Sequence, residues 1–230
     1  PGFAEETPQL DLLKEGEPHY TRWSSIGVYY LVRGQYSITD DLIKVVFRVY
    51  DTVSKYYIFG FEYDPIKTSG ARHAAHRISD DIVKRIMDVK GVARTRICFI
   101  RQSDPSARGK QVCLMDADGY PESIHRLTGA NDLSATPCWG LYAGEVFYTT
   151  YRDYNPDLEG LILKTGQRWF ISRQPGFNLS PSWSASRQRI CLTLTKDGNS
   201  EVYTLGRDGR KLKRLTRNPS IDSSPAWSPD

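Results

Sequence analysis

The sequence lacks the features that mark a membrane span, a thiol or zinc centre, or a serine hydrolase. It has no run of about 18 apolar residues, so we expect no transmembrane segment. Its first residues show no signal-peptide pattern of basic, apolar and small side chains. The 4 cysteines form no C-x-x-C pair, which argues against zinc or thioredoxin chemistry. No G-x-S-x-G motif occurs either.

Charge of one sign is also scarce. The chain has 31 basic and 27 acidic residues, spread along its length. Polyanion-binding proteins instead gather basic residues into a patch or stripe. We therefore expect no nucleic-acid partner.

The residues that are abundant favour β structure. Hydrophobic residues make up 39% of the chain and charged residues 25%, as in ordinary globular proteins. Aromatic residues reach 12%, and many lie in alternating runs such as 28–32 and 146–151, a pattern typical of strands. The cysteines fall in similar segments, and we expect buried thiols there. Cys98 and Cys113 are the one pair that neighbouring strands would bring together.

A repeat dominates the second half of the sequence. The segments 135–140, 179–184 and 223–230 share a P-x-W element, and Trp139, Trp183 and Trp227 follow one another at intervals of 44 residues. Units of about 40 to 50 residues are typical of four-stranded propeller blades. Proline suits the entry of a strand because it donates no hydrogen bond, and the indole fills space between stacked sheets.

Three blades are predicted between residues 94 and 230. The first copy runs from Thr95 to Trp139, with a longer hairpin loop at Ser103–Lys110. Because about 4 to 8 blades are needed to close a ring, we expect the natural protein to continue beyond Asp230.

Residues 1–93 show no such repeat and predict an α+β domain. Alternating segments at 27–38, 42–52 and 56–63 are joined by short turns, which indicates an antiparallel sheet. Small and apolar residues then recur at three- and four-residue steps over 70–89, predicting one packed helix that stops at Gly91. Its other face, which includes Asp80 and Arg85, is predicted to be solvated.

Two patterns suggest metal ligands and are better explained otherwise. His73, His76 and Asp80 share a helix face but have no further ligand at a matching spacing, so we interpret them as solvated polar residues. Asp116-x-Asp118-Gly119 begins like a calcium loop but places Leu127 where the final Glu belongs, so we predict a hairpin turn. We therefore expect no metal, no cofactor and no catalytic residue.

With the helix, the junction and the repeat in place, the chain resembles the TolB family, the periplasmic propeller proteins of the Tol-Pal envelope system. It resembles an internal fragment, from about Glu17 onward. Residues after Trp139 and Trp183 depart from the family's Ser-Pro-Asp-Gly, which weakens the turn signature. The segments that carry the resemblance are 31–35, 47–52, 75–82, 94–100, 116–119 and 224–230.

The resemblance implies a non-enzymatic scaffold of about six blades, within the range that closes a ring. Such a protein lies in the periplasm, with a signal peptide upstream, and binds the lipoprotein Pal and the Tol-complex proteins. It supports envelope integrity and outer-membrane constriction at division, and bacteriocins exploit it. The implied partner-binding residues precede the conserved prolines: Phe177, Asn178, Ser180, Ser223 and Ser224. An exposed Phe177 would anchor the partner; the alternative is that its ring folds back to cap the blade.

Two other functions fit a W-S-P-D propeller. One is the propeller domain of a prolyl-oligopeptidase-like serine peptidase, whose hydrolase domain would have to lie outside these residues because they contain no G-x-S-x-G motif. The other is a cytosolic interaction module, which a signal peptide in the full reading frame would distinguish from a periplasmic scaffold.

Overall fold

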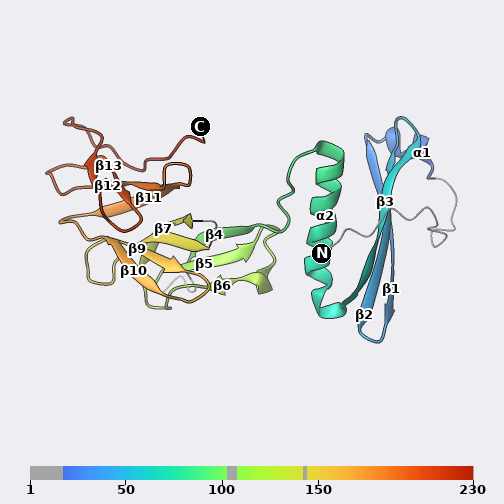
Figure 1. Cartoon of the computed structure of the whole chain (residues 1–230), viewed down its shortest axis with the longest axis horizontal. Coiled ribbons are helices and arrows are strands. Elements are labelled where there is room, and N and C mark those ends of the chain that lie inside the picture. The colour runs from blue at the N-terminus through green and yellow to red at the C-terminus, as the bar shows by residue number, and fades with distance from the viewer. Residues whose placement is uncertain (1–17, 103–107, 142–143, 230) are drawn as a thin grey trace. The chain divides into compact units, whose positions relative to one another are not determined.

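The computed structural model describes residues 18–102, 108–141 and 144–229 (Figure 1). The chain divides into two compact units, Pro1–Arg94 and Thr95–Asp230. The boundary falls one residue after the one expected from the end of the helix and the start of the repeat. The fold class predicted from the sequence, an α+β unit followed by propeller blades, is confirmed.

The first unit is a three-stranded antiparallel sheet in the order β1-β2-β3, with one long helix on one face (Figure 1). Asp40 and Asp41 both have positive φ, of 50° and 69°, as a tight two-residue hairpin turn requires. The elements are α1 (Tyr20–Ser24), β1 (Tyr30–Thr39), β2 (Leu42–Asp51), β3 (Tyr56–Lys67), the short 3-10 helix η1 (Thr68–Gly70) and α2 (Ala71–Met87).

The core of this unit lies between the sheet and α2. Alternate positions on β2 and β3 point to the same face, and the aliphatic stripe of the helix packs there. Buried Phe47, Val49, Phe59 and Phe61 meet a stripe on α2, formed by Ile78, Ile82 and Ile86.

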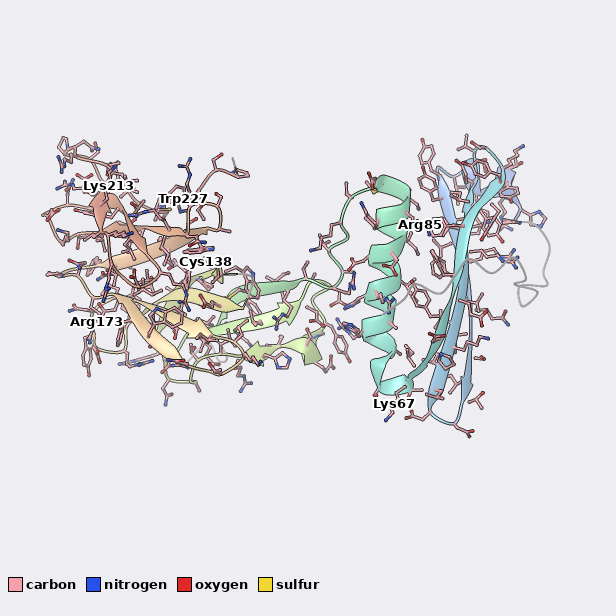
Figure 2. The ribbon with its side chains drawn as sticks, viewed as in Figure 1. Lys67, Arg85, Cys138, Arg173, Lys213 and Trp227 are labelled. Atoms are coloured by element: carbon pink, nitrogen blue, oxygen red, sulfur yellow. The ribbon has the colours of Figure 1, made fainter. Side chains whose placement is uncertain are left out.

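Two details of the predicted helix were wrong. It ends at Met87 and is capped by Asp88, which has a left-handed φ of 53°, so it does not extend to Gly91. Asp80 is buried and not solvated, at 5% exposure. Arg85 is exposed, as predicted, but it lies on the side of α2 toward the sheet (Figure 2), with its guanidinium 5.0 Å from the ring centre of Phe61. Its long side chain covers the edge of the aromatic core while the charge stays near water.

The second unit contains three antiparallel sheets that follow one another along the chain, each a blade. The first has β4 (Arg96–Arg101), β5 (Gln111–Asp116) and β6 (His125–Arg126), with the short η2 (Pro121–Ser123) between the last two strands. The second has β7 (Ser134–Trp139), β8 (Glu145–Thr150), β9 (Asp157–Ile162) and β10 (Arg168–Ser172). The third has β11 (Asn178–Ser184), β12 (Arg189–Leu194), β13 (Glu201–Gly206) and β14 (Lys213–Arg214).

The P-x-W segments of β7 and β11 each open a blade, and all three P-x-W segments share a backbone irregularity. The pairing register shifts within β7 and within β11 just before the tryptophan. At the residue preceding each proline, φ is positive: 44° at Thr136, 52° at Ser180 and 53° at Ser224. An extra residue of this kind is a β-bulge, and a proline without an N–H fits beside it. The backbone conformation therefore repeats with the same 44-residue period as the sequence.

Trp139 and Trp183 lie between blades, as predicted. Trp183 packs edge-to-face on Phe147 of the preceding blade, with ring centres 5.7 Å apart. Trp227, in a segment outside the named strands, donates from its indole Nε1 to the carbonyl oxygen of Ser182 at 3.1 Å. Trp139 belongs to the cluster between the first two blades, with Val112, Leu114, Val146, Tyr148 and Leu161.

All four cysteines are free thiols. Cys98 pairs across the ladder with Leu114, and Cys113 pairs with Phe99. Because side chains directly opposite in an antiparallel ladder share a face and successive ones alternate, these two thiols point to opposite faces. The pairing considered from the sequence is therefore not formed.

Two predicted turns have different outcomes. Asp116–Gly119 forms a turn, in which the Gly119 amide donates to the Asp116 carbonyl at 3.0 Å. Gly119 has a φ of 75°. Most of the longer loop expected at Ser103–Lys110, namely 103–107, lies outside the described residues.

Candidate partner-binding face

The predicted binding residues lie at one end of the blades. In an antiparallel meander, successive connections alternate between the two ends of the sheet. The connections into β7 and β11 therefore share an end with the β8–β9 and β12–β13 hairpins. We call this the entry end of the blades, because the chain enters each new blade there.

The entry end is held by backbone hydrogen bonds that recur with the repeat. The amides of Tyr151 and Thr195, 44 residues apart, donate to the carbonyls of Leu133 and Phe177 at 2.9 and 3.2 Å. In each entry segment, the amide of the next residue donates to a carbonyl in a hairpin of the preceding blade. These hairpins are β8–β9, β12–β13 and, in the first blade, the equivalent β4–β5 connection. These bonds run from Ser134 to Lys110, from Asn178 to Pro156 and from Asp222 to Ser200.

Equivalent positions in these segments carry exposed apolar side chains. Leu133, Phe177 and Ile221 each lie six residues before a repeat tryptophan. Their side chains are 40%, 52% and 77% exposed. Single exposed apolar residues are common on protein surfaces, but these three share one position of the repeat. We call these three residues the apolar row.

Phe177 projects from a fixed backbone. Its amide donates to Thr195 Oγ1 at 2.8 Å, and its carbonyl accepts from the Thr195 amide. The preceding Gly176 has a φ of 78°, and a Cβ there would overlap Thr195 Oγ1, so glycine is required. With half of its surface exposed, the ring does not fold back to cap the blade.

Asn178 serves the loop and does not face solvent. Its side chain is fully buried, at 0% exposure. Its Nδ2 donates to the carbonyl oxygens of Gln174 at 2.9 Å and Pro156 at 3.2 Å. Its Oδ1 accepts from Ser172 Oγ at 2.6 Å and from the Gln174 amide at 3.0 Å. Any role of Asn178 in binding is therefore through the position of Phe177.

The three predicted serines lie just before the prolines of the P-x-W segments. Ser180 is half-buried, whereas Ser223 and Ser224 are exposed. The Ser224 amide donates to Thr193 Oγ1 of the preceding blade at 3.1 Å. These residues thus belong to two successive entry segments, and Trp227 ties the second to β11 through Ser182.

A buried carboxylate positions the segment that leads to Ile221. Glu201, at the start of β13, accepts from Thr216 Oγ1 at 2.5 Å, from the Asn218 amide at 3.1 Å and from Arg214 at 2.8 Å. The Thr216 bond, with those from Asn218 and Arg214, lowers the pKa of Glu201 to about 2, although burial alone would raise it. The carboxylate is therefore ionised near neutral pH.

Leu133 was missed by reasoning from the sequence, and Ile221 is not among the five binding residues that the resemblance implies. The 44-residue period was applied to the tryptophans and the residues next to the prolines. Counting six residues back from Trp139 would have found Leu133. Tyr154 is also 97% exposed, in the β8–β9 hairpin at the same end of the blades. No repeated position in the sequence would have indicated this residue.

No arrangement for metal chemistry is found in the described residues: no three His, Cys, Asp or Glu side chains gather there. The carboxylate of Asp80 bonds to Arg94 and to backbone amides, so it is not available to His73 and His76. Within the same ranges, no helix is long and apolar enough to cross a membrane.

The fold defines the class of protein: an α+β unit followed by blades of a β-propeller. Residues 4–57 match the model of the TolB amino-terminal domain, and residues 83–230, more than half of the chain, match that of the TolB beta propeller domain. The chain belongs to the TolB family.

Two relatives illustrate the likeness. The chain is 29% identical over 196 residues to the Tol-Pal system protein TolB of Desulfosudis oleivorans, an alignment covering 85% of this chain and 43% of that protein. It is also similar to the crystal structure of TolB from Acinetobacter baumannii, with a TM-score of 0.77 and 25% identity over 92% of this chain and 52% of that one. The chain thus spans about half the length of these relatives.

Proposed function

We propose that this chain is part of a non-enzymatic periplasmic scaffold of the Tol-Pal system, and that the entry end of its blades binds the lipoprotein Pal. Through Pal and the Tol-complex proteins, the scaffold maintains envelope integrity and supports outer-membrane constriction at division. Bacteriocin import is a further use of the same scaffold. A signal peptide upstream of these residues would direct the protein to the periplasm.

The observation that carries this proposal is the apolar row. Leu133, Phe177 and Ile221 are exposed at the same place in three successive repeats, and in each case the next residue is held by an equivalent backbone hydrogen bond. A rigid scaffold that presents a few exposed side chains on loops suits recognition of a partner. Phe177 is the largest side chain of the row, and we assign it as the anchor. Ser180, Ser223 and Ser224 would supply polar contacts beside it.

The first unit favours this function over the peptidase alternative. Residues 4–57 match the TolB amino-terminal domain, which a peptidase propeller would not be expected to carry. The peptidase would also need a nucleophile motif that these 230 residues lack. A full reading frame with a hydrolase domain would overturn the scaffold proposal, and one without a signal peptide would favour the cytosolic module.

The test is binding of the full-length protein to the periplasmic domain of Pal from the same source, measured by titration calorimetry. Replacing Phe177 by Ala should weaken binding by about 2 kcal/mol, or roughly 30-fold in Kd, as expected for an anchor residue. Tyr120→Ala is the matched control: Tyr120 is 42% exposed, but it lies in the β5–β6 connection at the opposite end of a blade. No binding by the unmodified protein would refute the function.

A further inference from the structure

Asp80 joins α2 to the segment that follows the helix. Its Oδ1 accepts from the Ala93 amide at 2.7 Å, and its Oδ2 accepts from Arg94 Nε at 2.7 Å and from the Arg94 amide at 3.3 Å. Burial alone would raise the pKa of Asp80, but the bonds from Arg94 and Ala93 outweigh it and the pKa is lowered. A charged carboxylate that accepts several N–H bonds is among the stronger polar contacts in proteins.

Gly91 lets this segment approach the helix. The residue is buried, and a Cβ added there would overlap Asp80 Oδ1 and lie 2.5 Å from Asp80 Cα. Because backbone Cα cannot move aside as a flexible side chain would, only glycine fits without displacing the segment. Residues 91–94 therefore lie directly over Asp80, after the helix has ended at Met87.

The chain is fixed again one residue later. The carbonyl of Thr95 accepts from the Ala117 amide at 3.0 Å, and β4 begins at Arg96. Both partners of this bond belong to the second unit. Arg94 is thus held by the first unit and Thr95 by the second, with no free residue between the two attachments.

We propose that Asp80 is a latch that makes residues 91–94 a rigid extension of α2, so that any rotation between the two units takes place at the Arg94–Thr95 linkage. When the latch is open, residues 89–94 become a flexible tether. This inference does not depend on the identity of the partner.

Limited digestion with trypsin tests the latch, because trypsin cleaves after Arg94 only when that side chain and its backbone are free. In the full-length protein, Asp80→Asn should speed cleavage after Arg94 at least about tenfold, since cleavage follows the population of the open form. Gly91→Ala attacks the same contact from the opposite side and should have the same effect. Asp88→Asn is the matched control, an exposed carboxylate near the same end of α2 paired with Lys84.

The fragments distinguish a latch from general unfolding. Cleavage after Arg85, within α2, should stay at the rate of the unmodified protein in both variants. Equal cleavage after Arg94 in Asp80→Asn and in the unmodified protein would overturn the proposal. Faster cleavage after Arg85 and Arg94 together would also overturn it, because Asp80 would then be holding the whole unit and not the junction alone.

Discussion

Replacement of Asn178 by Ala should destabilise the propeller although the residue lies in a surface connection. The side chain is fully buried and makes hydrogen bonds to both sides of the loop that presents Phe177. Alanine leaves Ser172 Oγ and the amide and carbonyl of Gln174 without these partners. The Pro156 carbonyl would lose its bond from the Asn178 side chain but would still accept from the backbone amide of that residue, at 2.8 Å. Losing the side-chain bond there should therefore cost little.

The expected cost follows from the number of groups left unpaired. Each buried polar group without a partner costs about 1 to 3 kcal/mol, and part of this loop can recover bonds to water. We therefore expect Asn178→Ala to lower the free energy of unfolding by about 2 to 3 kcal/mol. Ser172→Ala removes only one of the bonds and should cost about 1 kcal/mol.

The measurement is urea unfolding of the full-length protein, followed by tryptophan fluorescence, with the slopes compared as well as the midpoints. Phe177→Ala is the companion variant: because its ring is half-exposed, its effect on stability should be within about 0.5 kcal/mol. A cost below about 0.5 kcal/mol for Asn178→Ala would refute the assignment of Asn178 as the residue that holds the loop.

Three further predictions concern the blades. Glu145 is buried and accepts two hydrogen bonds from Arg207 of the next blade. Arg207→Met should therefore lower the free energy of unfolding by about 2 to 3 kcal/mol, because it leaves the carboxylate unpaired. In urea unfolding, a smaller loss of stability than in Glu145→Gln would contradict this. The pKa of Glu201 is lowered from 4.5 to about 2, so its stabilisation is present above pH 4.5 and lost as pH falls through about 2; Thr216→Val should reduce this acid dependence, and unchanged acid titration of stability would count against it. Burial raises the pKa of Cys138 to about 12, so thiol reagents at neutral pH should react with it only after unfolding, and rapid labelling of the native protein would disprove this.

The sequence predicted the architecture because its strongest signals are periodic. The spacing of Trp139, Trp183 and Trp227 reports the blade, and the residue before each proline repeats even its left-handed backbone. The first unit was equally clear, because its strands alternate and its helix carries an aliphatic stripe. Apolar residues recur at the positions that pack into the core, so a periodic sequence pattern predicts the strands, the helix and the repeat unit.

Single polar residues were harder to place. Asp80 was expected in solvent because a carboxylate on the polar side of a helix usually lies there. Its partners, Ala93 and Arg94, come from an irregular segment that no periodicity describes. Asn178 was expected on a surface because it lies in a loop just before the proline of the repeat, yet its side chain bonds to the backbone carbonyls of Pro156 and Gln174. The environment of such residues depends on tertiary contacts.

The proposal that the entry end binds Pal is tested most directly by hydrogen exchange of the full-length protein with and without the periplasmic domain of Pal. We predict slower exchange on binding at amides in 129–136, 174–180 and 218–224, the segments that carry Leu133, Phe177 and Ile221. The opposite end of the blades, including 117–124 and 185–188, should be unchanged. Protection at those opposite connections, with none around Phe177, would contradict the proposal.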